Sequence, residues 1–210
     1  MKKIIIIGSG GFAAEAYSYI SQHENAEIKF IDDVDPNYAR EDIKPKIIGK
    51  ISDLDDSIIS ENLFFIGYGD PRKKQVIYNS IKEFNLKYYS FIHPTSQVST
   101  SAKLSDGCFL YPFTVIANNA KIGSHCVINS YSAIGHDSTL GNFSTLSAHV
   151  DITGNVNVGE VCFFGSGSRT LPNINIADDS RVGAGNVVLR NTSKSDILMP
   201  NVPKKIRPKK

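Results

Sequence analysis

The half of the chain that begins at Ile92 carries an apolar residue at every sixth position. The series runs for seventeen positions to Val188, and Thr170 alone interrupts it, with Leu171 beside it. A period of six matches neither the 3.6 residues of an α-helix turn nor the alternation of an ordinary strand. It is typical of a parallel β-helix, in which short strands wind into stacked coils. We therefore predict a β-helix over residues 92–190.

A second periodic position supports this prediction. The residue four positions after each apolar residue is small in most repeats, as a narrow coil interior requires. Three repeats form one triangular coil, so side chains 18 residues apart lie above one another. Cys108, Cys126 and Cys162 occupy such positions, separated by 18 and 36 residues. We expect their side chains to pack inward and predict no role for them in metal binding or catalysis.

Residues 1–91 show a different pattern. Apolar strands are predicted at 3–7, 27–31, 62–66 and 87–92, and helices at 12–21 and 71–84. Strands that alternate with helices are typical of a small parallel α/β domain. The predicted organisation is a Rossmann-like domain over 1–91, the β-helix over 92–190, and a C-terminal cap with a basic tail over 191–210. We expect the first and last of these to cover the open ends of the β-helix.

Composition excludes two classes of protein. The formal net charge of +2 is too small for a nucleic-acid-binding domain. No apolar stretch approaches the roughly 20 residues of a membrane span, and the run at 4–7 is too short for a signal peptide. We therefore expect a cytoplasmic location. The basic tail at 204–210 is open to two interpretations, a solvated terminus or a phosphate contact.

The first strand leads into a glycine-rich turn, Gly8-x-Gly10-x-x-Ala13, which opens a helix. Backbone N–H groups at such a helix start bind phosphate, and an acidic pair, Asp32-Asp33, follows the next strand. Residues 1–91 supply little more than half of a dinucleotide fold. The turn therefore favours one nucleotide-like moiety, such as a nucleotide sugar, over NAD; a purely structural turn remains the alternative.

The next strand-to-helix turn contains Gly67 and Arg72. In parallel sheets these carboxyl-end turns line the ligand crevice. Arg72 is therefore interpreted either as a phosphate contact or as a solvated side chain.

One of the five histidines stands in a context suited to catalysis. His136 lies at an outer turn of a middle coil and is followed by Asp137, which could orient the ring and stabilise its charged form. Gly154 lies 18 residues further on, so its N–H could face an oxyanion formed beside His136. His125, also in a coil turn, is expected to be exposed, and His149 to lie at a groove.

The chain resembles the sugar acyltransferases of the hexapeptide superfamily. Within it, the chain is most similar to the sialic-acid O-acetyltransferase and bacillosamine-type branch. The motifs that carry the resemblance are Gly8-Ser9-Gly10-Gly11, Phe30-Ile31-Asp32-Asp33, Ile66-Gly67 with Arg72, Ile92-His93-Pro94, Ile128-Asn129, Ile134-Gly135-His136-Asp137, Gly154-Asn155-Val156, Leu171-Pro172-Asn173 and Asn201-Val202-Pro203-Lys204. The resemblance implies left-handed winding, a homotrimer, and acetyl-CoA bound between two β-helices, with no metal.

The resemblance also implies residue roles. His136 would be the general base, Asp137 its acidic partner, and Gly154 the donor to the oxyanion. The nucleotide sugar would be contacted by Gly10, Gly11, Asp32, Asp33, Gly67 and Arg72, and Asn129 would place the acceptor sugar. Acetyl-CoA would be contacted by Thr145, His149, Gly165 and Lys204. Relatives often have a second histidine where this chain has Thr145, and His149 is a candidate to replace it.

The expected function is acetyl-CoA-dependent N-acetylation of a nucleotide-linked 4-amino-deoxy sugar, by direct attack of the amine on the thioester. The alternative within the enzyme class is O-acetylation of a sialic-acid-like sugar. The alternatives outside it are a non-catalytic β-helix scaffold and an NAD-binding module. Small-molecule partners are expected, with neither nucleic acid nor a membrane span.

Overall fold

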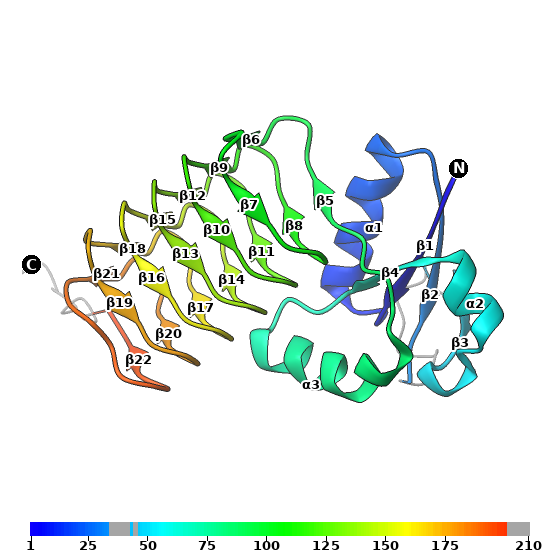
Figure 1. Ribbon diagram of the computed structural model, residues 1–210. Coiled ribbons are helices and arrows are strands. Elements are labelled where there is room, and N and C mark those ends of the chain that lie inside the picture. The colour runs from blue at the N-terminus through cyan, green and yellow to red at the C-terminus, as the bar shows by residue number, and fades with distance from the viewer. Residues whose placement is uncertain (34–42, 44–45, 201–210) are drawn as a thin grey trace, which may run out of the picture.

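The computed structural model describes residues 1–33, 43 and 46–200. Figure 1 shows an N-terminal α/β domain beside the first coils of a long prism of stacked strands. In none of the described residues is there a helix long and apolar enough to cross a membrane.

The N-terminal domain has a four-stranded parallel sheet in the order β3-β2-β1-β4. The elements are β1 (Lys2–Ile7), α1 (Gly11–His23), β2 (Ala26–Ile31), β3 (Ile47–Gly49), α2 (Asp56–Glu61), β4 (Leu63–Ile66) and α3 (Pro71–Ile81), with 3-10 turns at Ile51–Asp53 and Lys82–Phe84. The four isoleucines of β1 at positions 4–7 are at most 1% exposed, because α1 covers one face of the sheet and α3 the other. Pro71 starts α3 directly after Asp70, whose side chain accepts a hydrogen bond from the Lys73 N–H.

One predicted strand differs. Residues 87–92 do not form a continuous strand: Tyr88 makes an isolated bridge to Phe64 at the edge of the first sheet, and β5 (Phe91–Ile92) already belongs to the prism. The chain changes sheets between these two points, which ends the pairing of the first domain.

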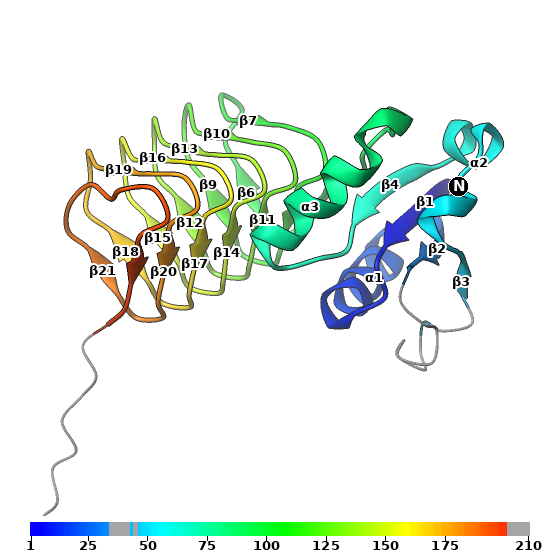
Figure 2. The ribbon, with the colours of Figure 1, turned by 90° about the horizontal axis from the view of Figure 1, so that it is seen from below.

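The prism has three parallel sheets of two-residue strands (Figure 2), stacked at intervals of 18 residues except between β20 and β22, where the interval is 16. The strands of face B are β5 (Phe91–Ile92), β8 (Phe109–Leu110), β11 (Val127–Ile128), β14 (Thr145–Leu146), β17 (Phe163–Phe164), β20 (Arg181–Val182) and β22 (Ile197–Leu198). Those of face C are β6 (Gln97–Val98), β9 (Val115–Ile116), β12 (Ala133–Ile134), β15 (Asp151–Ile152), β18 (Arg169–Thr170) and β21 (Val187–Val188). Those of face D are β7 (Lys103–Leu104), β10 (Lys121–Ile122), β13 (Thr139–Leu140), β16 (Asn157–Val158) and β19 (Asn175–Ile176). The predicted β-helix is confirmed, and β22 extends face B into the predicted cap.

The interior follows the six-residue period. Large apolar residues such as Ile128, Ile134 and Leu146 pack in one core with the three cysteines, each of which is fully buried. The small inward residues also bind neighbouring coils: the Sγ of Cys126 donates to the Gly141 carbonyl at 3.2 Å. The hydroxyls of Ser132, Ser138 and Ser144 each donate in the same way to the carbonyl 15 residues later. The inward position of the cysteines is therefore confirmed.

The N-terminal domain packs on face B and does not cover the end of the prism. Phe109, Tyr111 and Val127 point outward from face B into the core beneath α1, and Tyr19 meets Tyr111 edge-on at 5.2 Å. Ile92, in the first coil, remains 46% exposed. The expectation that this domain closes the end is wrong, because the apolar residues of α1 pack instead against the outward-pointing aromatic side chains of face B.

Candidate active site

His136 and Asp137 lie at the turn that joins face C to face D. Asp137 adopts a left-handed conformation with a φ of 59°, which Asp and Asn tolerate better than most residues. Its Oδ2 lies 2.8 Å from Nδ1 of His136, and its Oδ1 accepts a hydrogen bond from the side-chain amide of Asn119 at 3.0 Å. Both hydrogen bonds lower the pKa of Asp137, and the bond with His136 has the larger effect. The carboxylate is therefore held against Nδ1, which leaves Nε2 free to exchange a proton.

Gly154 lies next to Nε2 of His136, one coil further along the prism. A Cβ added at Gly154 would be 2.5 Å from Nε2, so the imidazole rests directly over this glycine. Among the described residues none accepts a hydrogen bond from the Gly154 N–H. The corner thus brings together a base, its orienting carboxylate and an unengaged backbone donor, which is the set that acyl transfer requires.

The three faces place this corner far from the first domain of the same chain. His136 lies on the edge between faces C and D, and the N-terminal domain lies on face B, which is opposite that edge. The carboxyl end of β4 meets face B where Gly69 accepts a hydrogen bond from Thr145 Oγ1 at 2.8 Å. The glycine-rich turn and His136 of one chain therefore do not share a cleft.

The glycine-rich turn has free space where a ligand would bind. A Cβ added at Gly10 or Gly11 meets no atom within 4 Å, and neither residue has a positive φ. Packing therefore does not demand glycine at either position. Gly67 differs, because a Cβ there would collide with Ala13 and Ile6. Close packing alone accounts for the glycine at 67, whereas 10 and 11 keep the start of α1 open.

The acidic pair holds the loops around this turn. Asp32 is 5% exposed and accepts hydrogen bonds from the backbone N–H and the hydroxyl of Ser9, at 2.6 and 2.5 Å. Asp33 accepts a hydrogen bond from the Ile51 N–H at 2.9 Å. Both carboxylates thus lie beside the glycine-rich turn, where the sequence places them, and each has a partner within the protein.

Arg72 has a partner that the sequence does not reveal. Its guanidinium forms a two-point ion pair with Asp179, at 2.6 and 2.8 Å, and lowers the pKa of Asp179 to about 2. Arg181 of the β-helix pairs in turn with Asp70 at 2.7 Å. Arg72 is therefore an exposed side chain that is held by Asp179 of the β-helix, and the two ion pairs join the domains.

Thr145 is also buried between the domains. It is 7% exposed, and its hydroxyl accepts a hydrogen bond from Nζ of Lys74 at 2.9 Å. The same ammonium donates to the His125 carbonyl at 2.8 Å, and complete burial lowers the pKa of Lys74 to about 8. The prediction that Thr145 contacts acetyl-CoA fails for this chain taken alone, because α3 covers it.

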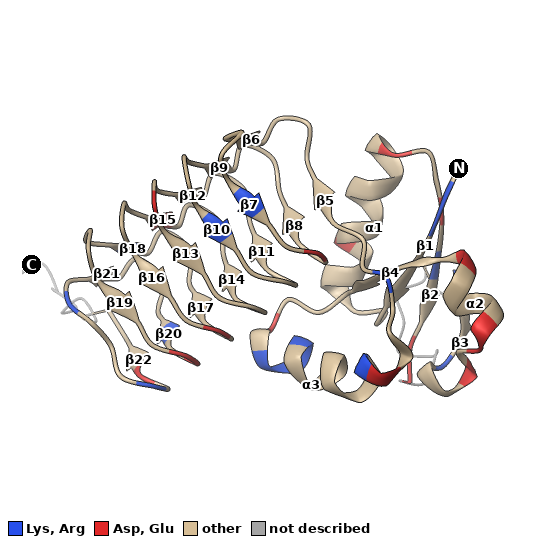
Figure 3. Cartoon of the chain, in the orientation of Figure 1, with Lys and Arg blue, Asp and Glu red and all other residues tan. Residues whose placement is uncertain are grey.

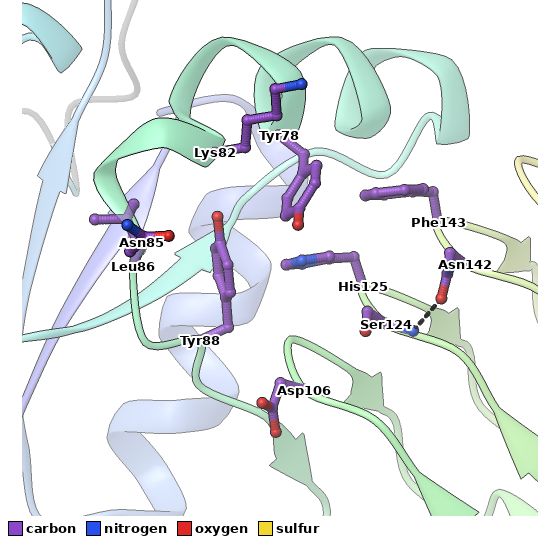
Figure 4. Close-up of a pocket in the computed structure, with 10 residues that line it drawn as sticks. All are labelled: Tyr78, Lys82, Asn85, Leu86, Tyr88, Asp106, Ser124, His125, Asn142 and Phe143. Carbon is purple, nitrogen blue, oxygen red and sulfur yellow. Dashed lines mark hydrogen bonds between the residues drawn. The ribbon is translucent and has the colours of Figure 1, made fainter.

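His125 is buried, so the expectation that it is exposed is wrong. Its ring is 2% exposed and stacks on Phe143 at 5.3 Å, with Tyr88 meeting it edge-on at 4.4 Å. Figure 4 shows this cluster in a cavity of about 420 Å³ under α3, together with Tyr78. Burial lowers the pKa of His125 to about 4, so the ring is neutral at neutral pH. The sequence cannot show which turn α3 covers.

The remaining candidates lie at other places on the prism. Asn129 stands at the turn between faces B and C, and its Oδ1 accepts from the Ser130 N–H at 2.7 Å. His149 is exposed at the same edge and stacks on Tyr131 at 5.0 Å. Gly165 is required by coil stacking, because a Cβ would lie 2.5 Å from the Ala184 nitrogen. Lys204 lies outside the described residues. None of these three described residues shares the edge that carries His136.

Two residues near these sites were not predicted. Asn119, which bonds Asp137, stands 18 residues before it, so the coil repeat contains the signal that would have found it. Lys74 has no such signal, because its partners come from distant coils. In the described part of the chain no group of three or more His, Cys, Asp or Glu side chains could hold a metal.

Comparison with known proteins identifies the two parts of the chain. Residues 3–81 match the PglD N-terminal domain family, and residues 101–136 match the bacterial transferase hexapeptide family of six repeats. Both parts of the chain are thus similar to hexapeptide-repeat acyltransferases. The predicted family and the left-handed β-helix fold are therefore confirmed. No curated protein matches the sequence.

Solved structures resemble this acyltransferase over nearly its whole length. PerB of Caulobacter crescentus, solved with CoA and GDP-perosamine, is 28% identical to this chain, with a TM-score of 0.85. The alignment covers 99% of this chain and 98% of PerB. WeeI of Acinetobacter baumannii AYE is 19% identical, with coverages of 96% and 98% and a TM-score of 0.81. The acetyltransferase domain of PglB from Neisseria gonorrhoeae FA1090 is 22% identical, with coverages of 98% and 100% and a TM-score of 0.70. The last two show the common fold.

Proposed function

We propose that this acyltransferase moves the acetyl group of acetyl-CoA to the amine of a nucleotide-linked amino sugar. The observation that carries the proposal is the contact of His136 with both Asp137 and Gly154. The likeness to PerB and to a variant of the perosamine N-acetyltransferase of Caulobacter crescentus, both solved with CoA and GDP-perosamine, supports the choice of donor and acceptor. The open turn at Gly10 and Gly11 supports a nucleotide as part of the acceptor.

The chemistry follows from the contacts of His136. The acceptor amine attacks the thioester carbon while Nε2 of His136 removes a proton from nitrogen, and Asp137 stabilises the imidazolium at Nδ1. The carbonyl oxygen becomes an oxyanion, which the Gly154 N–H stabilises by a hydrogen bond. The intermediate then collapses, the C–S bond breaks, and His136 returns the proton to the sulfur of CoA.

A second copy of the chain completes this site in our proposal. The glycine-rich turn lies at face B and His136 at the opposite edge, so a nucleotide bound to one chain reaches the His136 of a neighbour. Cyclic repetition of that contact gives a closed oligomer, for which we propose a trimer with acetyl-CoA between adjacent prisms. Asn129, His149 and Gly165 would then be contacted from the neighbouring copy, whereas Thr145 is covered by α3 of its own chain.

The first test replaces His136 by Ala and measures thiol release from acetyl-CoA with a panel of nucleotide 4-amino sugars and free sialic acids. General-base catalysis contributes about 10²–10⁴-fold, so we expect a loss of at least 100-fold in kcat. The matched control is His23→Ala, an exposed histidine at the end of α1. A loss below tenfold in the His136 variant would refute the general-base role, and activity confined to free sialic acids would refute the nucleotide-linked acceptor.

The second test asks whether two chains form one site. The variant Gly11→Trp fills the open space at the glycine-rich turn, and His136→Ala removes the base; each alone is expected to be inactive. Unfolding and refolding the two together should restore part of the activity, because some sites combine the intact turn of one chain with the intact His136 of another. A mixture as inactive as its components, with wild-type activity recovered under the same procedure, would exclude the shared site.

A further inference from the structure

A groove on face D carries two lysines that no part of the mechanism uses. The groove, of about 410 Å³, is lined by Ser101, Lys103, Asn119, Lys121, Asp137 and Thr139. It therefore begins at the carboxylate that orients His136. Figure 3 shows β7 and β10 as the two basic strands of this face, side by side.

The two lysines are direct neighbours in the sheet. Lys103 pairs in register with Lys121, so their side chains leave adjacent parallel strands, which lie about 4.8 Å apart. Both are exposed, and among the described residues neither has an ion-pair partner. Like charges placed opposite one another destabilise a sheet. Repulsion between the two ammonium groups therefore destabilises the fold, and a bound anion would remove this repulsion.

Other lysines of the chain contrast with this pair. Lys2, Lys3 and Lys29 each form an ion pair with a glutamate at 2.6 to 2.8 Å. The nearest carboxylate in the groove, that of Asp137, already binds His136 and Asn119. The positions that continue the lysine column toward the C-terminus, Thr139 and Asn157, are neutral and bonded to each other at 3.0 Å. Along this column of face D, positive charge is thus confined to the two coils that precede the candidate base.

We propose that Lys103 and Lys121 bind the diphosphate bridge of the nucleotide-linked acceptor. The inference rests on the proposed function, which it deepens by assigning this groove. Two ammonium groups on adjacent strands suit two linked phosphoryl groups, and both lysines line the same groove. The sugar that follows the diphosphate then extends toward Asp137 and His136.

The order of the coils decides between two sources of diphosphate, since CoA also contains one. The Gly154 N–H, which would bind the thioester oxygen, lies on the coil after His136. Lys103 and Lys121 lie on the coils before it, where the groove continues from Asp137. The acyl donor therefore approaches from the later coils, and the earlier coils are left to the acceptor.

The test uses Lys103→Gln, Lys121→Gln and the double variant, with Lys87→Gln, an exposed lysine of the first domain, as the matched control. Hydrogen bonds to charged groups correspond to about tenfold or more in affinity, so we expect each single variant to raise the acceptor KM about tenfold. The KM for acetyl-CoA and kcat at saturation should stay within twofold. In a second arm, calorimetry with inorganic pyrophosphate should show binding to the wild type and its loss in the double variant.

Each outcome separates the inference from its alternatives. A rise in the acetyl-CoA KM instead would assign the groove to CoA and overturn the acceptor assignment. Unchanged KM values together with unchanged pyrophosphate binding would overturn the site altogether. If no nucleotide sugar is acetylated by the wild type but pyrophosphate binding depends on both lysines, the anion site stands and the proposed function fails.

Discussion

Replacing Gly154 by Ala tests the arrangement of the candidate active site most directly. The added methyl group would lie 2.5 Å from Nε2 of His136, whereas ordinary contact needs about 3.5 Å, so the ring must retreat by roughly 1 Å. Misplacing a reacting group by about 1 Å costs on the order of 10²-fold in rate. The side chain of His136 is 61% exposed and can swing into solvent. The free energy of unfolding should therefore change by less than about 1 kcal/mol.

The control for this variant is Gly141→Ala, at another turn of the prism. A Cβ at Gly141 would collide with the carbonyl of Gly159, which is backbone and cannot move aside. This variant should lose about 1–3 kcal/mol of stability. Thiol release gives kcat, and urea unfolding gives the stability of both variants. A Gly154 variant that keeps more than a fifth of the wild-type kcat, or that loses as much stability as the Gly141 variant, would refute the reasoning.

Three further predictions follow from individual contacts. In Asp137→Asn, His136 loses the carboxylate that stabilises its charged form, so kcat should fall by about 10–100-fold with an unchanged KM for acetyl-CoA; an unchanged kcat would contradict this. The pKa of Lys74 is lowered to about 8 in the folded state, against about 10.4 in the unfolded chain. Between pH 8 and about 10.4 the folded state therefore binds fewer protons than the unfolded state, and the free energy of unfolding must rise with pH over this range. Urea unfolding of the wild type relative to Lys74→Met should show this as a gain of about 3 kcal/mol between pH 8 and 10.5, and parallel curves would exclude it. In Cys126→Ser, the hydroxyl can keep the bond to the Gly141 carbonyl, as Ser144 does with Gly159, so activity should stay within twofold and a larger loss would restore a chemical role for the thiol.

The periodic features of the fold are predictable because each coil repeats the geometry of the one before it. The six-residue period locates the strands from β6 to β21, and the count of 18 places Gly154 against His136 and stacks the cysteines. In the first domain β1, β2, β4, α1 and α3 follow from local pattern in the same way, whereas β3 and α2 were not predicted. The segment at 87–92 differs from its prediction, because its pairing depends on where the two sheets meet.

Contacts between the two domains are not periodic, and they account for the errors. The N-terminal domain packs on face B because of the aromatic residues Phe109 and Tyr111. Both residues are compatible with the six-residue repeat, so the sequence pattern does not indicate that this face is covered. That choice buries His125 and Thr145 beneath α3 and directs Arg72 to Asp179. Sequence periodicity specifies position within a coil, whereas the packing of a second domain depends on the shape of a whole face.

The bonds between successive coils have a consequence for the order in which the prism opens. Each coil is held by its two neighbours, through the strand ladders and through inward bonds such as that of Ser138 to Thr153, so disruption must spread coil by coil from an end. The first coils are covered by α1 and α3, while within the described residues β22, the last strand, pairs with β20 alone. Fraying should therefore begin near Leu198 and advance toward the N-terminus. His136 and Gly154 occupy middle coils, so amide hydrogen exchange at the candidate active site should remain slow even when the far end of the prism is already exchanging freely.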